Sequence, residues 1–362
     1  MVFLHHYGGG AQSSFLPLRV FGQAVQIGWA GVSLFFVLSG FLITGILWDS
    51  LLKPNWWRRF YIRRSLRIFP LYYFAIIVGI IAAAACGIAS FSTKPILIYV
   101  FYLQDIPALR QAFEQFPRPL ILDHFWSLAV EEQFYLIWPF LLLLCRQKLQ
   151  RARNLCVMVW ILSLGFRLGV VYMDAPLEWA QRFLVSRSGE LAAGSFLALS
   201  VRGDETRVRE RLKFAPWAFF SSLIVIVAAF MLSGALDLKF SPMSRYWLVS
   251  TIGISAIGVF FASLLALTLN PGLLKTIFEM RFLRWLGKIS YGIYVYHVLL
   301  RPMFDSLANR IVPRSSVLVH QATLAIIATI GTLTIATVSF YTLERMFNRL
   351  KGSSIKVINP AM

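Results

Sequence analysis

Charged residues are scarce in this sequence of 362 residues: they make up 14% of the chain, against about 25% in soluble domains. Hydrophobic residues reach 58%, and the mean hydropathy is +0.68. This composition excludes an ordinary soluble protein and a disordered chain. Length alone would suggest two or three soluble domains, but this composition predicts a single bundle of membrane-spanning helices.

Cysteine is also rare, with Cys86, Cys145 and Cys156 as the three examples. None forms a CxxC pair, and no spacing of cysteine and histidine is typical of a zinc site. We therefore interpret the cysteines as small apolar side chains within the bundle, and we predict no bound metal.

The fold class expected from these features is all-α, a polytopic membrane bundle of about ten transmembrane helices. A helix needs about 20 apolar residues to cross the hydrocarbon core. The expected spans are Gly28–Trp48, Leu71–Phe91, His124–Cys145, Asn154–Met173, Phe183–Val201, Pro216–Leu236, Tyr246–Leu269, Phe282–Arg301 and Val317–Leu343. Pro95–Leu103 is too short to cross and is expected to be interfacial or re-entrant. Met1–Tyr7 reads as the outer end of a further helix that begins upstream.

The net charge of +19 would suggest a nucleic-acid partner in a soluble chain. In a membrane chain, the positions of the basic residues indicate how the protein is oriented across the membrane. Basic residues gather on alternate loops: six in Lys53–Arg67, four in Arg146–Arg153, five in Arg202–Lys213 and four from Arg345 onward. Because basic loops face the cytoplasm, we expect a cytoplasmic C-terminus. We predict one transmembrane domain, residues 1–350, a cytoplasmic tail, residues 351–362, contact with membrane lipid and no nucleic-acid partner.

Ionisable groups at membrane depth are costly unless they are paired or hydrated, so each is a candidate functional residue. The first candidates are His5 and His6, just before three glycines. An imidazole titrates near neutral pH and can act as a general base or a nucleophile. The alternative is a pair of interfacial histidines at a helix end.

A second candidate is the basic segment Trp56–Pro70, in which Arg59, Arg63 and Arg67 recur every four residues. Arg64 lies three residues before Arg67, so on a helix these guanidinium groups share one broad face. This face could rest on anionic lipid. Alternatively it could bind a phosphorylated molecule, because arginine pairs with phosphate through two hydrogen bonds.

A third candidate is a polar stripe within the span that begins at His124. His124, Ser127, Glu131 and Tyr135 fall on one side of a helix. Glu132 is about 100° away from Glu131, and is expected to pair with a neighbouring helix. Hydrogen bonding between helices is the alternative to a functional role.

The remaining intramembrane polar groups lie in three later spans. Ser290, Tyr294, His297 and Arg301 form one helical stripe. Arg187 and Glu190 are three residues apart and are predicted to pair, and an acidic partner is expected for Arg167. Stabilisation between helices and lining of a cavity both remain open for these groups.

Five strings resemble the integral-membrane acyltransferase type 3 family, and they occur in the order typical of it across nearly the whole chain. They are GVSLFFVLSGFLIT (Gly31–Thr44), RRSLRIFP (Arg63–Pro70), FWSLAVEEQFYL (Phe125–Leu136), LGKISYGIYVYH (Leu286–His297) and YTLER (Tyr341–Arg345). The resemblance implies a multi-pass protein of the bacterial inner membrane. It also implies transfer of an acyl group, often acetyl, from cytoplasmic acyl-CoA to a hydroxyl of a carbohydrate or lipid-linked glycan, such as a lipopolysaccharide or another envelope polysaccharide.

The resemblance also implies roles for particular residues. The family's first helix carries an arginine, ten residues and then a catalytic histidine, which matches His6, with His5 the alternative, and places the arginine ahead of Met1. The family's Arg-x-x-Arg matches Arg64 and Arg67, which would bind acyl-CoA as a cosubstrate, with no tightly bound cofactor expected.

The remaining assignments combine this resemblance with the chemistry of acyl transfer, which needs a base or a nucleophile, positive charge for phosphates and a donor for the developing oxyanion. Arg63 would assist acyl-CoA binding, and Glu131 would orient His6 or hold the acceptor. The predicted acceptor-binding residues are Ser127, Glu132, Tyr135 and His297.

Two alternatives from other classes remain open. A transporter or flippase for an amphipathic glycan could line a pathway with the same buried charges, although such proteins carry internal repeats and none is visible here. An inactive relative with a regulatory or scaffolding role is the other.

Overall fold

The protein is all-helical throughout the part of the chain that this computed structural model describes: residues 1–7, 22, 25–85, 94–112, 122–235, 247–312 and 317–350. The long helices are α3 (Ala30–Trp48), α4 (Trp56–Ala85), α7 (Trp126–Leu144), α8 (Leu149–Tyr172), α10 (Leu184–Ser200), α12 (Ala215–Ala235), α13 (Ile254–Leu269), α15 (Arg281–Leu299) and α17 (Val317–Ser339). The predicted tail and Cys86 lie outside the described residues.

Shorter helical segments connect or extend the long ones. They are α1 (Val2–Tyr7), η1 (Ile27–Trp29), α5 (Lys94–Val100), α6 (Pro107–Ala112), η2 (Asp123–Phe125), α9 (Glu178–Arg182), α11 (Glu205–Leu212), η3 (Val249–Gly253), α14 (Leu273–Phe278), α16 (Arg301–Ile311) and η4 (Phe340–Glu344). As expected, the segment around Pro95–Leu103 forms only a short helix, α5, which has too few residues to cross a membrane.

Seven helices of the described chain are long and apolar enough to span a membrane, so the expected count of about ten is not confirmed. The expected span Phe183–Val201 forms α10, but its 17 residues fall short of the usual crossing length. The expected span Phe282–Arg301 forms α15, which carries three basic residues in its first half and is too polar to be counted. The segment Met1–Tyr7, expected to be the end of a further helix, contains α1, a helix of six residues.

The basic segment Trp56–Pro70 is continuous with the span that follows it. Together they form α4, a helix of 30 residues that contains Pro70. At 1.5 Å per residue this helix is about 45 Å long, which exceeds the hydrocarbon core of about 30 Å. Helix α4 is therefore long enough to cross the hydrocarbon core and to extend its arginine-rich start toward the membrane surface.

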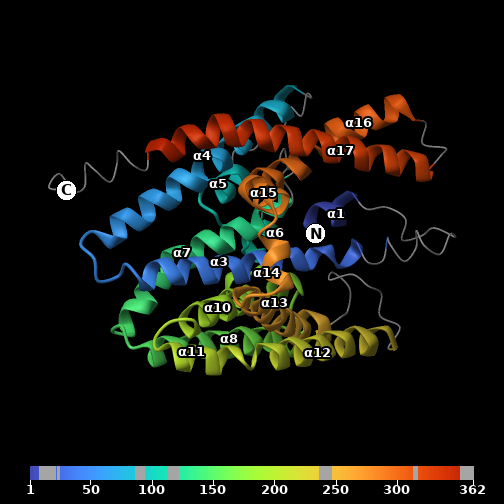
Figure 1. Cartoon of the computed structure of the whole chain (residues 1–362). Helices are drawn as coiled ribbons and strands as arrows, with labels where there is room; N and C mark the ends of the chain where they lie inside the picture. The colour runs from blue at the N-terminus through green and yellow to red at the C-terminus, as the bar shows by residue number, and fades with distance from the viewer. Residues whose placement is uncertain are drawn as a thin grey trace.

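The long helices form two groups that meet along α7 (Figure 1). In one group α10 packs against α3, α8 and α13, and α12 packs against α13; in the other, α15 packs against α4 and α17. Helix α7 joins them because Val130 and Phe134 pack in the core of the first group, whereas Leu128 and Ala129 pack in the core of the second.

The basic segments gather at one end of the bundle. Figure 1 shows that the α3–α4 connection, the α7–α8 connection, α11 and the end of α17 lie together there. Helix α1 lies at the opposite end, against η1 and the start of α3. The alternation of basic loops along the sequence therefore corresponds to a physical polarity of the bundle.

Helices α3 and α10 cross at backbone contact, and two glycines allow this approach. A Cβ added at Gly40 would lie 1.9 Å from the carbonyl oxygen of Leu191, and a Cβ added at Gly194 would lie 1.9 Å from that of Val37. Small residues at helix crossings let backbones approach closely in membranes. This crossing fixes the position of the polar residues that both helices carry.

We expect the Gly40→Ala variant to lose about 1–3 kcal/mol of unfolding free energy, because an added methyl group must push two backbones apart. Gly165→Ala on α8 is the matched control, since a Cβ there meets no atom within 4 Å. Thermal unfolding of both purified variants in detergent measures the difference. Equal midpoints for the two variants would contradict this account of the crossing.

The predicted pair of Arg187 and Glu190 on α10 is confirmed. Nη2 of Arg187 lies 3.1 Å from Oε1 of Glu190, and their side chains are 3% and 1% exposed. Ser33 of α3 donates a hydrogen bond of 2.9 Å to the same carboxylate oxygen. This buried polar group thus links α3 to α10 next to their close crossing.

Arg167 of α8 differs from expectation, because its hydrogen-bond partners are not acidic. Its guanidinium donates to the hydroxyl of Ser163 at 2.8 Å, and also to the hydroxyl of Ser255 and the carbonyl oxygen of Ser186. One carboxylate oxygen of the nearby Glu190 accepts hydrogen bonds from Arg187 and Ser33, and the other has no hydrogen-bond partner among the described residues. Neutral oxygen atoms therefore surround a guanidinium that is fully buried.

Candidate functional site

A cavity of about 500 Å³ lies between α3, α4, α7 and α15, with α1 against it. It follows the polar stripe of α7, because Glu131 and Tyr135 line it. Helix α15 supplies Ser290, Tyr294 and His297 to the lining, three of the four residues of the predicted stripe; Arg301 is not among the described lining residues. Two stripes from distant parts of the chain thus face one cavity.

At one end of the cavity, α4 supplies Arg64 and Arg67. The guanidinium carbon of Arg64 lies 5.0 Å from the centroid of the Tyr135 ring, a cation–π contact. The hydroxyl of Tyr291 donates a hydrogen bond of 2.9 Å to the carbonyl oxygen of Ile68, which ties α15 to α4 at this position. Two positive charges therefore face a cavity whose remaining lining is largely apolar.

Glu131 lines the cavity and is held by neutral donors. The hydroxyl of Tyr135, one turn further along α7, donates a hydrogen bond to the Glu131 carboxylate. The hydroxyl of Ser39, from α3, lies 2.7 Å from the hydroxyl of Tyr135. These contacts fix the orientation of Glu131 within electrostatic range of Arg64 and Arg67.

Three imidazoles meet at the other end. The ring of His297 lies 5.1 Å from that of His6 and 5.2 Å from that of His124, measured between centroids. These residues come from α15, α1 and η2, so the cluster joins the start, the middle and the end of the chain. The ring of His5 lies 5.4 Å from His6.

His297 is oriented by backbone groups. Its Nδ1 lies 2.7 Å from the carbonyl oxygen of Tyr294 and 3.1 Å from that of Ile293, so Nδ1 carries the proton in the neutral ring. Its Nε2 has no hydrogen-bond partner in the described part of the chain, which leaves a lone pair available. Tyr7 donates to the carbonyl oxygen of His297, and this contact attaches α1 to α15.

The two ends of the cavity are separated along the helices. Eleven residues separate His124 from Tyr135, which corresponds to roughly 16 Å at 1.5 Å per residue. Arg64 and Arg67 belong to the part of α4 nearer the basic end of the bundle, whereas the imidazoles lie beside α1 at the opposite end (Figure 1). A long molecule with an anionic head could thus bind the arginines while its other end approached the imidazoles.

The structure brings most of the predicted site residues together. The predicted residues that line the cavity are Arg64, Arg67, Glu131, Tyr135 and His297. His6 contacts His297, and Ser127 shares a hydrogen bond with the lining residue Tyr294. His5 lies on the side of η1, where a Cβ added at Gly28 would lie 2.9 Å from the Cβ of His5.

Five predicted site residues are not among the described residues that line the cavity: His5, His6, Ser127, Arg63 and Glu132. Arg63 is exposed. Glu132, about 100° around α7 from Glu131, has one buried carboxylate oxygen without a hydrogen-bond partner among the described residues. The expected pairing of Glu132 with a neighbouring helix is therefore not seen at that oxygen.

Sequence reasoning did not assign His124 or Tyr294 to the site. Each lies on one of the two polar stripes predicted from the spacing. The three-residue spacing of His124 from Ser127 was the signal that could have assigned His124 to the site. The hydroxyl of Tyr294 donates a hydrogen bond to the carbonyl oxygen of His124. This contact could not be predicted from local spacing, because the two residues are 170 positions apart in the sequence.

Comparison with known proteins gives consistent matches. Residues 1–341 match the family described as an acyltransferase domain. The putative peptidoglycan O-acetyltransferase YrhL of Bacillus subtilis is 29% identical over 317 residues, which are 81% of this chain and 48% of that protein. The peptidoglycan O-acetyltransferase OatA of Listeria monocytogenes is 29% identical over 288 residues, 75% of this chain and 44% of that protein.

The O-acetyltransferase OatA of Staphylococcus aureus is 28% identical over 304 residues, 76% of this chain and 46% of that protein. The chain thus spans about half the length of the curated relatives it matches. No solved structure matches it.

Proposed function

Because this chain belongs to the membrane acyltransferase family that its motifs resemble, we propose that it transfers an acyl group, most simply acetyl, from acyl-CoA to a hydroxyl of a cell-envelope glycan. The observation that supports this most is the single cavity that joins Arg64 and Arg67 to His297 and, through it, to His6. The relatives named as peptidoglycan O-acetyltransferases favour peptidoglycan over lipopolysaccharide as the acceptor.

In this proposal the arginines bind the phosphates of the donor. Hydrogen bonds between arginine and phosphate are charge-assisted and directional. The orientation of the bundle follows from the same feature: the basic end faces the cytoplasm, where acyl-CoA is available, and the C-terminus lies on that side. The imidazoles then lie toward the outer face of the bacterial plasma membrane, where the acceptor arrives.

His6 carries out the transfer in one of two ways. As a general base it accepts the proton of the acceptor hydroxyl; the oxygen attacks the thioester carbonyl, the C–S bond breaks, and the proton passes to the departing thiolate of CoA. As a nucleophile its ring nitrogen first forms an acyl-imidazole with release of CoA, and the hydroxyl then attacks that intermediate. In both cases His297 orients the His6 ring, and Glu131 holds the acceptor.

Donor binding is the direct test of the proposal. Acetyl-CoA at 100 times its dissociation constant should stabilise the purified protein by about 2.7 kcal/mol, visible as a higher thermal-unfolding midpoint. Replacing Arg64 or Arg67 by glutamine should raise the apparent dissociation constant at least about tenfold, because a hydrogen bond to a charged group contributes about 1.5–3 kcal/mol.

Two further substitutions on α4 sharpen this test. Arg58→Gln is the matched control, since Arg58 is exposed and stacks beside Trp57 at 5.5 Å; it should leave the midpoint shift unchanged. Arg63→Gln measures the assisting role predicted for Arg63. If acetyl-CoA produces no shift with the unmodified protein, the proposal fails, and a transporter or an inactive relative becomes the better interpretation.

A further inference from the structure

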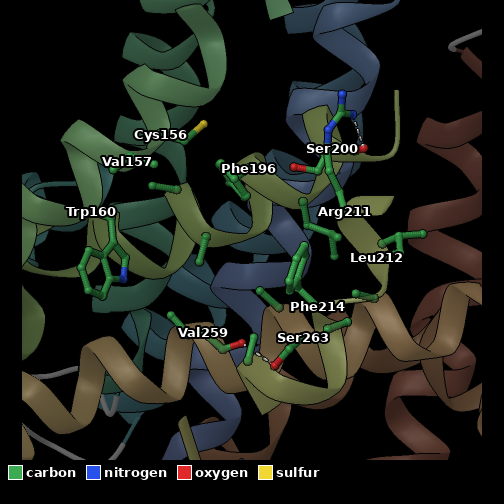
Figure 2. Close-up of a pocket in the computed structure, with 17 residues that line it drawn as sticks. Cys156, Val157, Trp160, Phe196, Ser200, Arg211, Leu212, Phe214, Val259 and Ser263 are labelled. Carbon is green, nitrogen blue, oxygen red and sulfur yellow. Dashed lines mark hydrogen bonds between the residues drawn. The ribbon is translucent and has the colours of Figure 1, made fainter. Parts of the chain in front are cut away.

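A second cavity, of about 480 Å³, lies between α8, α10, α12 and α13 and is separate from the candidate site. Figure 2 shows Trp160 and Val157 on one side of it, Phe214 and Leu212 on another, and Val259 with Ser263 below. Its lining is almost wholly apolar. Val157 and Phe196 are 44% and 40% exposed, so the cavity opens toward the surface of the bundle.

This opening lies between α8 and α12, which pack against different helices. Helix α8 packs against α10, whereas α12 packs against α13. Both α8 and the span that contains α12 are candidate membrane spans whose surfaces are largely exposed. The cavity is therefore a gap in the protein surface at a depth where the surrounding medium is lipid hydrocarbon.

One end of the cavity is polar, and the hydroxyl of Ser200 there lacks a partner. The Ser200 side chain is 4% exposed, and its hydroxyl has no hydrogen-bond partner among the described residues. A buried donor without a partner costs free energy, so a ligand that supplies oxygen atoms at this position would stabilise the site.

Positive charge surrounds that end. Arg211 lines the cavity beside Ser200 (Figure 2) and donates hydrogen bonds to the carbonyl oxygens of Ser200 and Arg202, at 2.9 and 3.3 Å. No carboxylate of the described chain pairs with it. The charge of Arg153 interacts with the charges of Arg211 and Arg207. Nη1 of Arg153 is buried and has no hydrogen-bond partner in the described structure.

We propose that this cavity binds one anionic phospholipid, with an acyl chain between α8 and α12 and the phosphate on Arg211 and Arg153. The apolar lining fits an acyl chain, the unpartnered hydroxyl of Ser200 fits an ester oxygen, and the guanidinium groups fit a phosphate. The polar end of the cavity, with Ser200 and Arg211, faces the end of the bundle that carries the basic segments, which suits a lipid from that leaflet. This inference goes beyond acyl transfer and does not depend on it.

Trp160 provides the measurement. The full chain is placed in nanodiscs of dioleoyl-phosphatidylcholine, and phosphatidylglycerol with brominated acyl chains is added at increasing mole fraction. The fluorescence of Trp160 is obtained by subtracting the tryptophan emission of the Trp160→Phe variant from that of the unmodified protein. We expect quenching that saturates at low mole fraction, with an at least fivefold preference over brominated phosphatidylcholine.

Three variants test which groups bind the lipid. Arg211→Gln should abolish the preference for phosphatidylglycerol, Arg211→Lys should retain most of it, and Arg209→Gln on the same helix should change nothing, because Arg209 is 80% exposed and pairs with Glu205. Ala193→Phe fills the cavity and should remove the saturable component. If that variant does not fold, Val157→Phe, at an exposed position of the lining, blocks the same opening.

Quenching that rises in proportion to mole fraction and is equal for both brominated lipids would overturn the proposal, because it describes contact with bulk lipid. A saturable component that survives in a folded cavity-filling variant would overturn it as well.

Discussion

The His6→Ala variant is expected to lose acetyl transfer by a factor of about 10²–10⁴, the usual contribution of a general base, or by more if the imidazole is the nucleophile. The expectation follows from the position of the ring, which lies 5.1 Å from His297 at the end of the cavity remote from the arginines. The measurement is transfer of labelled acetyl from acetyl-CoA to a soluble peptidoglycan fragment by protein in proteoliposomes.

His5→Ala is the matched control, because the two histidines are adjacent but His5 lies toward η1. Its activity should remain within a few-fold of the unmodified protein. A thermal-unfolding midpoint near that of the unmodified protein must accompany each result, so that loss of folding is not mistaken for loss of chemistry. Full activity in both variants would refute the assignment of the site.

The choice between base and nucleophile needs a different observation. Incubation with labelled acetyl-CoA without acceptor should leave label on the protein only if an acyl-imidazole forms. Label that disappears in His6→Ala and remains in His5→Ala would identify the intermediate. Absence of label in an enzyme that still transfers acetyl to the acceptor indicates direct attack with His6 as the base.

Local spacing predicted those parts of the site that lie on one helix. The 3.6-residue period placed Glu131 and Tyr135 on one face of α7 and Glu132 on another, and the structure has Glu131 and Tyr135, but not Glu132, among the lining residues. Arg187 and Glu190, one turn apart, paired as expected. In each case the backbone of a single helix determines the distance between the side chains.

Long-range contacts could not be predicted in this way. His6, His124 and His297 converge from three segments, and nothing in their spacing indicates that they meet. The partners of Arg167 are hydroxyl and carbonyl groups of α8, α10 and α13, whereas charge alone suggested an acid. Hydropathy predicted the long apolar helices, but α10 and α15 are too short or too polar to be counted as spans.

The Glu190→Gln variant is expected to lose about 3–5 kcal/mol of unfolding free energy, because it leaves the buried charge of Arg187 without its counter-ion. Arg187 is 3% exposed, and its remaining contacts are Ser33 at 3.2 Å and the rings of Phe36 and Trp126 at 5.4 and 5.6 Å. These cannot neutralise a positive charge in a low-dielectric interior. Unfolding of the purified variant in detergent measures the loss.

A double variant separates the lost pairing from the lost side chain. Arg187→Met with Glu190→Leu removes both charges and should recover much of the stability, because apolar residues of similar volume often replace a buried ion pair without loss. A double variant as unstable as Glu190→Gln would show that the polar contacts with α3, rather than charge compensation, dominate.

The pair of Arg202 and Asp49 at the basic end of the bundle is the exposed control. Its atoms approach to 2.6 Å, but the Asp49 side chain is 60% exposed, so Asp49→Asn should cost less than about 1 kcal/mol. Hydrogen bonds from Arg202 hold the pKa of Asp49 below its ordinary value. The contribution of this surface pair is therefore present at neutral pH and is lost as the pH falls through that lowered pKa.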